Sequence, residues 1–338
     1  MTSPMREPGE SEAFAYTGPE WMGKANWHSV SEGYLLKALK PVLFVLAEAL
    51  LAVNRRNPQA VLDRSYDGAE RLLGWIRGVR GTRTEPVALP NCPAEWVWNS
   101  RSAPDGPTVI YFHGSAFIAL GLNSHRPLVS TIARDSGARV LNVGYRLCPR
   151  NPVEDAISDG VDAYRHVLAS GVQPENIVVA GDSAGGFIAA MTAVAVRDMG
   201  LRPPAGAVLL SPATDSDMEP KYRAAHAVPD AMFPVNFLRL VSEVFLQHNG
   251  ARGPVDSPVD ADLRGLGPFL LQVGSQEMLR PDSELLARCL AEDGVPVRLQ
   301  IFDRAVHVFQ AFAFINPDAR RAIGQIAEFI TSVAARRS

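Results

Sequence analysis

The spacing of apolar residues changes near residue 85, and the change divides the chain into two kinds of predicted structure. In Leu35 to Val53 and in Pro58 to Ile76, apolar residues recur every three or four positions, as on one face of an amphipathic helix. Farther along, short runs of β-branched and aromatic residues predict strands that alternate with helices. This alternation is typical of βαβ units. We therefore expect an α/β fold with a mostly parallel, doubly wound sheet and a separate helical cap.

The individual elements can be placed by their apolar patterns. Predicted strands are Glu95 to Trp98, Thr108 to Phe112, Arg139 to Val143, Ile177 to Ala180, Gly206 to Leu210, Phe269 to Val273 and Val297 to Phe302. Predicted helices are Arg126 to Arg134, Val153 to Ala169, Phe187 to Val196, Ser283 to Glu292 and Ala319 to Ala335. Residues 1 to about 25 are expected to be poorly ordered, and Gly78, Gly81 and Pro86 are expected to interrupt regular structure.

A long segment between two strands interrupts the alternation. Ser211 to Gly267 holds six prolines and one amphipathic run, Val235 to Gln247. Ligands of open α/β sheets bind beyond the carboxyl ends of the strands, so an insertion after a strand can cover the site. We predict four segments: an N-terminal helical cap segment (1–80), the first part of the core (81–210), a cap insertion (211–255) and the second part of the core (256–338).

A Gly-x-Ser-x-Gly motif carries the strongest chemical signal. Ser183 lies between Gly181 and Gly185, after a predicted strand and before an Ala-rich predicted helix. A turn this tight excludes side chains beside it and exposes the serine hydroxyl above the sheet. The motif therefore predicts a nucleophile at Ser183, whereas the alternative reading is an ordinary glycine-rich turn.

A serine nucleophile needs a base and a group that orients the base. His307 follows the last predicted strand, at the same edge of the sheet as Ser183. Two acids follow the strand between them. Glu277 lies in the loop, while Asp282 directly precedes a predicted helix and therefore has a competing structural role as an N-cap. We favour Glu277 as the orienting acid, with Asp282 as the alternative.

Acyl transfer also needs N–H donors for the oxygen that becomes negative. The N–H of Ala184, at the start of the helix, is one predicted donor. The turn from His113 to Phe117 follows another strand and is positioned to supply the others. His113 is then a residue that holds this turn rather than a base. Together with Asp182 and Asp282, it is a candidate for supporting the site without reacting.

The motifs together resemble the hormone-sensitive-lipase-like (family IV) bacterial carboxylesterases of the α/β-hydrolase fold. The order Ser, acid, His is that of α/β-hydrolases. The matching stretches are His113 to Phe117, Tyr145 to Pro149, Gly181 to Gly186, Ser211-Pro212, Ser257 to Val259 before Leu266 to Pro268, Gly274 to Glu277, and His307. The resemblance implies a cap and, often, a homodimer. It also implies N–H donors at Ser115, Ala116 and Ala184, with Gly114 shaping the turn.

The chain departs from this family in its oxyanion turn and its acid. Ser115 and Ala116 stand where the family has two glycines, and their Cβ atoms narrow the approach to the oxyanion site. Activity on bulky tertiary-alcohol esters, which the family's open glycine turn implies, is therefore not expected. Glu277 replaces the commoner aspartate, and its longer side chain must be accommodated by the loop.

These residues predict a serine carboxylic-ester hydrolase that acts through a Ser-His-Glu triad and an acyl-enzyme, with no metal or organic cofactor. Apolar residues assigned to the cap region predict a small-molecule substrate with a short- to medium-chain or aromatic ester, although they would look the same in a core: Phe117, Phe233, Phe237 and Phe245. A lactonase, amidase or acyltransferase would use the same triad. A non-catalytic receptor on this fold would lack the catalytic histidine, which is present here.

Charge and cysteine content limit the partners and the compartment. The 338 residues carry a net charge of −3, so no basic surface for nucleic acid is expected. The cysteines have no metal or disulfide spacing and fit a cytoplasmic protein: Cys92, Cys148 and Cys289. The polar stretch from Met1 to Glu12 does not resemble a secretory signal.

The apolar stretch from Leu35 to Val53 is nearly as long as a membrane-spanning helix. Four residues interrupt Leu35 to Val53: Lys37, Lys40, Pro41 and Glu48. A spanning helix needs about 20 predominantly apolar residues. Packing on the protein is therefore favoured, no stable membrane insertion is expected, and contact with a lipid surface is the alternative.

Overall fold

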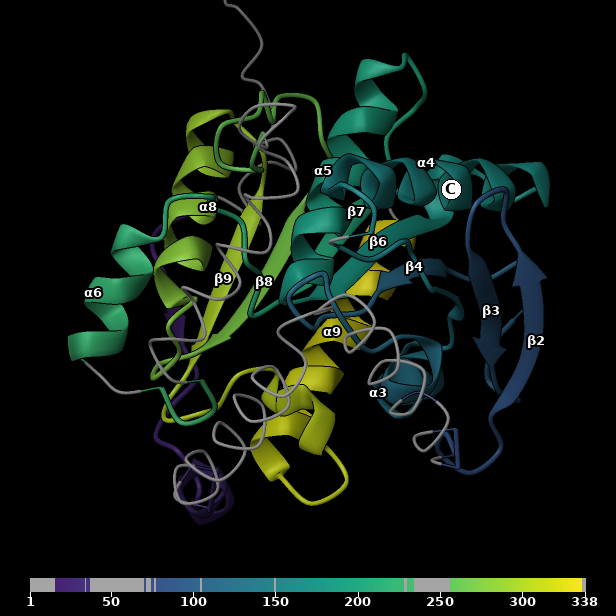
Figure 1. The fold of residues 1–338 in the computed structure, drawn as a ribbon. Coiled ribbons are helices and arrows are strands. Elements are labelled where there is room, and N and C mark those ends of the chain that lie inside the picture. The colour runs from purple at the N-terminus through teal and green to yellow at the C-terminus, as the bar shows by residue number, and fades with distance from the viewer. Residues whose placement is uncertain are drawn as a thin grey trace, which may run out of the picture.

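The computed structural model describes residues 16–33, 35–36, 70, 74–75, 77–103, 105–148, 150–227, 230–233 and 256–335. A nine-stranded sheet runs through them in the order β1-β9-β8-β7-β6-β4-β5-β3-β2 (Figure 1). Pairing is parallel from β1 through β5, and β3 and β2 add an antiparallel edge.

The strands span Glu20–Trp21 (β1), Arg83–Ala88 (β2), Pro93–Trp98 (β3), Thr108–Phe112 (β4), Arg139–Val143 (β5), Ile177–Asp182 (β6), Gly206–Leu210 (β7), Phe269–Gly274 (β8) and Val297–Phe302 (β9). The helices span Leu122–Ser136 (α3), Val153–Ala169 (α4), Ala184–Asp198 (α5), Glu219–Ala227 (α6), Arg280–Glu292 (α8) and Pro317–Ala335 (α9). Short 3-10 turns are Pro174–Asn176 (η2) and Phe309–Phe312 (η3).

Two apolar cores lie on opposite faces of the sheet. Helices α4, α5 and α8 cover one face, and α3 and α9 cover the other (Figure 1). The central strands β4, β6, β7 and β8 are buried along their whole length. A parallel strand covered on both faces needs apolar residues at consecutive positions, and this explains why these strands read as unbroken apolar runs.

The fold class and all seven strands expected from the sequence are present. Two further strands were not expected. β1 lies within the stretch predicted to be poorly ordered, where Glu20 and Trp21 pair with Gln300 and Ile301 of β9. β2 holds Pro86, which we expected to break structure; an edge strand tolerates a proline because one of its sides needs no N–H donor.

Helix α3 begins at Leu122, four residues before the predicted start at Arg126. The predicted start placed Pro127 at the second position of the helix. In the structure the side-chain hydroxyl of Ser124 instead accepts a hydrogen bond from the Gly121 N–H at 3.0 Å, and one more turn forms ahead of the proline.

Most of the predicted cap lies outside the described residues. Of the first predicted cap helix, Leu35 to Val53, only Leu35 and Leu36 are described. Of the second, Pro58 to Ile76, only Glu70, Gly74 and Trp75 are described. The run from Val235 to Gln247 lies wholly outside the described residues. In the insertion, α6 and residues 230–233 are described. Glu70 reaches the core, where its carboxylate accepts the N–H groups of Asn123 and Ser124 at the start of α3.

Candidate active site

Ser183 stands on a strained turn between β6 and α5. Its backbone has φ 52° and ψ −121°, in the left-handed half of conformational space that non-glycine residues rarely adopt. The flanking glycines are required by packing. A Cβ on Gly181 would lie 2.2 Å from the carbonyl oxygen of Gly185, and one on Gly185 would lie 2.0 Å from that of Phe112. The turn therefore has the geometry that the motif predicts.

Glu277 and His307 meet at the same edge of the sheet. Glu277 follows β8 and His307 follows β9, and both side chains are almost fully buried, at 4 % and 5 % exposure. The Nδ1–H of His307 donates to Oε2 of Glu277 at 2.8 Å. This bond leaves Nε2 of His307 without the proton, as a base requires.

The other carboxylate oxygen of Glu277 is also held. Its Oε1 accepts the hydroxyl of Ser211 at 2.8 Å and the N–H of Gly274 at 2.5 Å. Ser211 follows β7, so three neighbouring strand ends fix this acid. The longer side chain of glutamate is thus held by hydrogen bonds from its own loop and from the loops after β7 and β9.

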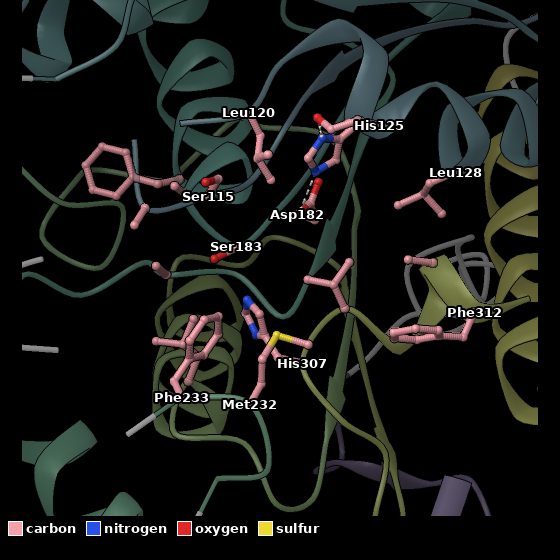
Figure 2. Close-up of a pocket in the computed structure, with 18 of the residues that line it drawn as sticks. Ser115, Leu120, His125, Leu128, Asp182, Ser183, Met232, Phe233, His307 and Phe312 are labelled. Atoms are coloured by element: carbon pink, nitrogen blue, oxygen red, sulfur yellow. Dashed lines mark hydrogen bonds and ion pairs between the residues drawn. The ribbon is translucent and has the colours of Figure 1, made fainter. Parts of the chain in front are cut away.

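The electrostatic environment keeps His307 basic. Burial would lower its pKa, but the hydrogen bond to Glu277 and the charge of that carboxylate outweigh burial and raise the pKa of His307 above its ordinary value. The ring of Phe233 meets the imidazole edge to face, with centroids 5.1 Å apart. Figure 2 shows the His307 ring on one side of Ser183 and Ser115 on the other.

The predicted oxyanion turn adopts left-handed backbone without glycine. Ser115, Ala116 and Phe117 have φ values of 93°, 55° and 65°. Gly114 precedes them and is needed for packing, because a Cβ there would lie 2.2 Å from Oδ2 of Asp182.

Asp182, the residue before Ser183, joins this turn to the strained turn at Ser183, here called the elbow. Its Oδ1 accepts the Gly114 N–H at 3.1 Å and the Tyr111 hydroxyl at 2.7 Å. Its Oδ2 lies 3.4 Å from Nε2 of His125 (Figure 2). Burial would raise the pKa of Asp182, but the charge of His125 and hydrogen bonds from His125 and Tyr111 hold that pKa below its ordinary value. The carboxylate is therefore ionised, and it holds the oxyanion turn.

His113 is a structural residue. Burial, with the charge of His125 acting in the same direction, lowers the pKa of His113 to about 3, so the ring is neutral at physiological pH. Its Nδ1 donates to the carbonyl oxygen of Gly114 at 2.9 Å. Tyr145 stacks on the ring and donates its hydroxyl to the His113 carbonyl at 2.7 Å.

Asp282 lies away from His307 and is not an N-cap. Helix α8 begins at Arg280 with Leu279 as its N-cap, so Asp282 lies in the first turn. Its carboxylate forms a buried ion pair with Lys221 of α6 at 2.9 Å and accepts the N–H groups of Thr214 and Asp215. Burial raises the pKa of Asp282 to about 6, although Lys221 opposes this. Asp282 joins the insertion to the core.

A cavity of about 940 Å³ opens over Ser183. Its walls come from the oxyanion turn, α3, the 3-10 turn η3 and the insertion, and they include Phe117. Figure 2 shows four further wall residues: Leu128, Met232, Phe233 and Phe312. Phe117 and Phe233 thus line the cavity, but Phe117 belongs to the turn after β4 and not to the cap region to which the sequence assigned it. Phe237 and Phe245 lie outside the described residues. Within the described ranges, no three His, Cys, Asp or Glu side chains are placed to hold a metal ion.

Sequence reasoning gave no role to several residues that support the site. Ser211 holds Glu277, whereas Tyr111 and His125 hold Asp182. Ser211 directly follows a predicted strand, a position that could have marked it. Tyr111 reads as an ordinary strand residue, and the sequence carries no signal for its bond to Asp182.

A family model described as an α/β-hydrolase fold matches residues 109–311. The chain belongs to the α/β-hydrolase family. The hydrolase is 36 % identical over 283 residues to the esterase LipU of Mycobacterium tuberculosis, covering 81 % of this chain and 92 % of that protein. It is 35 % identical over 266 residues to an acetyl-hydrolase of Streptomyces hygroscopicus, covering 79 % and 87 %.

Among solved structures, the hydrolase resembles an esterase from the bacterial hormone-sensitive-lipase family. The TM-score is 0.74 at 34 % identity, over 81 % of this chain and 92 % of that one. The matches confirm the predicted family, fold class and enzyme class, a carboxylesterase. No helix in the described part of the hydrolase is long and apolar enough to cross a membrane.

Proposed function

We propose that the hydrolase cleaves carboxylic esters with Ser183 as nucleophile, His307 as base and Glu277 as the acid that orients the base. The observation that carries this proposal is the buried 2.8 Å hydrogen bond between His307 and Glu277, beside a strained serine in one apolar cavity. The similarity to named esterases supports the same chemistry.

The reaction proceeds through an acyl-enzyme. Nε2 of His307 takes the proton as Oγ of Ser183 attacks the ester carbonyl, and the same imidazolium then protonates the leaving alcohol. Water, activated by His307, cleaves the acyl-enzyme. The negative oxygen of each tetrahedral intermediate accepts the N–H groups of Ser115, Ala116 and Ala184. Ala184 is the first residue of α5, where N–H groups have no intrahelical acceptor.

The substrate is a short- to medium-chain or aromatic ester. Apolar side chains from four elements line the cavity, and its volume lies in the range of sites that hold small organic molecules. Burial of acyl or aromatic carbon against these walls supplies binding energy, at roughly 25 cal/mol per Å² of apolar surface.

A series of p-nitrophenyl esters from acetate to laurate tests the nucleophile and the substrate class together. We expect turnover of the shorter members and loss of at least about 10³-fold in kcat for Ser183→Ala. Ser332→Ala, far away on α9, is the matched control and is expected to keep wild-type rates. Full activity of Ser183→Ala, or no turnover of any chain length by the wild-type protein, would contradict the proposal.

The pH profile tests the base. Since His307 must be neutral to accept a proton and its pKa is raised, activity is expected to be lost as pH falls through a value above about 6.5. The measurement is kcat/KM for one ester between pH 5 and 9 at constant ionic strength. A profile that stays flat down to pH 5.5 would rule out His307 as the base.

Location, assembly and the cap belong to the same proposal. A cytoplasmic location is supported by three free cysteines, of which Cys92 and Cys148 are buried. Cell fractionation tests it, and recovery in the culture medium would refute it.

Light scattering of the purified protein tests the homodimer that the family resemblance implies. The cap over the cavity is supported by Met232 and Phe233, which enter its wall from the insertion.

A further inference from the structure

A buried carboxylate in the insertion reaches the loop of the catalytic acid. Asp230 is 2 % exposed and lies between β7 and β8, in the described segment 230–233. Its Oδ1 accepts the N–H groups of Met232 at 2.7 Å and Phe233 at 2.9 Å. Its Oδ2 accepts the N–H of Met278 at 3.0 Å. One side chain therefore fastens a turn of the insertion to the core.

Both ends of this connection touch the candidate catalytic pair. Met278 directly follows Glu277, whose carboxylate holds His307. The ring of Phe233 meets the His307 imidazole edge to face at 5.1 Å. Met232, Phe233 and Met278 all line the cavity, and Figure 2 shows Met232 and Phe233 beside the His307 ring.

We propose that Asp230 is a positioning residue, which fixes Phe233 against His307 and the Glu277 loop against the insertion so that the base keeps its orientation. This inference rests on the proposed function of His307 and Glu277. The hydrogen bonds of Asp230 to described residues come from the backbone N–H groups of Met232, Phe233 and Met278. Asp230 acts through Phe233 and Met278, because its carboxylate accepts the backbone N–H of each. Phe233 contacts His307, and Met278 directly follows Glu277.

The charge of Asp230 gives this role a signature that packing alone lacks. Among the described residues, the charged groups that act on His307 include Glu277, Asp230 and Asp182, and each raises the pKa of His307. Burial strengthens such an effect, since the surroundings screen the charge poorly. Removing the negative charge at position 230 therefore lowers the pKa of the base.

Asp230→Asn is the main test. The Asn oxygen can still accept the N–H groups of Met232 and Phe233, but its NH₂ group then faces the Met278 N–H, donor against donor. We expect kcat to fall about 10-fold with KM changed less than about threefold. The acid limb of kcat/KM is expected to move to lower pH, because the charge that raises the pKa of His307 is removed.

Asp230→Glu separates charge from position. The longer side chain keeps the negative charge but cannot keep all three hydrogen bonds in place, so kcat is expected to fall while the acid limb stays near the wild-type value. Asp217→Asn is the matched control. It is an exposed aspartate of the same insertion that also accepts a backbone N–H, and it should change neither quantity.

A double-mutant cycle tests the route through Phe233. If Asp230 acts by holding that ring on His307, the double variant will lose less than the two single variants combined. The comparison is between the activation free energy lost in the double variant and the sum of the losses in Asp230→Asn and Phe233→Ala, each calculated from kcat. Fully additive effects, together with an unshifted acid limb, would overturn the inference and leave Asp230 a packing residue. Wild-type kcat and pH profile in both Asp230 variants would also overturn it.

Ser183→Ala, assayed beside these variants, distinguishes the two failures. If Ser183→Ala is inactive while the Asp230 variants match the wild type, only this inference fails. If Ser183→Ala is active, the proposed function fails first. If Asp230→Asn does not fold, shown by thermal unfolding, then Asp230→Glu and Phe233→Ala decide: wild-type kcat in both overturns the inference, and reduced kcat in both supports it.

Discussion

Two turns at the carboxyl edge of the sheet hold backbone in the left-handed region, and different interactions keep them there. The elbow at Ser183 is imposed by contact: Gly181 and Gly185 leave no room for a Cβ, and the adjoining strand and helix fix the rest. The oxyanion turn has left-handed residues at Ser115, Ala116 and Phe117 with no glycine among them. Polar bonds from Asp182 and His113 hold it instead.

This difference between the two turns shows which kind of backbone strain can be recognised in a sequence. Strain imposed by close packing requires glycines at fixed spacing, so it can be recognised in a linear motif. Strain held by a polar network depends on groups from separate strands, such as Tyr111 and Asp182, which are 71 residues apart. The sequence predicted the position of both turns, but only the structure shows the polar network that holds the second one.

The largest expected effect comes from filling the space at the elbow. Gly185→Ala would place a Cβ 2.0 Å from the Phe112 carbonyl oxygen, a backbone atom that cannot move without distorting β4. We expect the free energy of unfolding to fall by at least about 3 kcal/mol, measured by thermal or urea unfolding. Gly324→Ala on α9, where a Cβ meets nothing within 4 Å, should be neutral or stabilising. Equal stability of the two variants would show that packing does not impose the elbow.

A smaller effect, on catalysis rather than stability, is expected from the polar network. Asp182→Asn keeps the shape and can still accept the Tyr111 hydroxyl and the Gly114 N–H, but it loses the charge opposite His125. We expect kcat to fall about 10- to 100-fold with little change in KM, because the oxyanion donors lose their alignment. Asp198→Asn, on the surface of α5, is the control. An unchanged kcat for Asp182→Asn would refute a positioning role for this network.

The smallest effect tests strain directly. Ala116→Gly relieves a left-handed φ of 55° and is expected to raise the free energy of unfolding by about 0.5 kcal/mol. Ala261, whose φ is not positive, should respond in the opposite direction when changed to Gly. Thermal unfolding of both variants checks the sign. Destabilisation of both by the same amount would show that the oxyanion turn stores no strain at this residue.

Much of the fold could be predicted because the central strands carry their own signal. β6 and β8 are apolar at consecutive positions, since helices cover both of their faces. β1 could not be found in this way: two residues form a strand only because β9 offers an unpaired edge. β2 was missed for a related reason, as Pro86 is compatible with a strand only when one side of that strand is free.

The candidate site likewise contains residues that could be predicted from the sequence and residues that could not. Ser183, Glu277 and His307 each follow a recognisable strand, so topology alone brings them to one edge. Asp230 and Ser211 act across 48 and 66 residues of sequence, through bonds to the backbone and side chain of the acid loop. The bond of Ser211 follows from the pairing of β7 with β8, whereas no local pattern predicts the bonds of Asp230, because they depend on how residues 230–233 of the insertion pack on the core.

The pairing of β1 with β9 also orders the events of biosynthesis. Glu20 cannot find its partner Gln300 until 280 further residues have been made. At translation rates of 5–20 residues per second this delay is roughly 15–55 s. His307 follows the same late strand, so a nascent chain contains Ser183 for some time before the proposed base, His307, has been synthesised. Closure of the sheet edge and synthesis of the proposed base therefore belong to the same late stage, and a growing chain that lacks His307 also lacks the group proposed to activate Ser183.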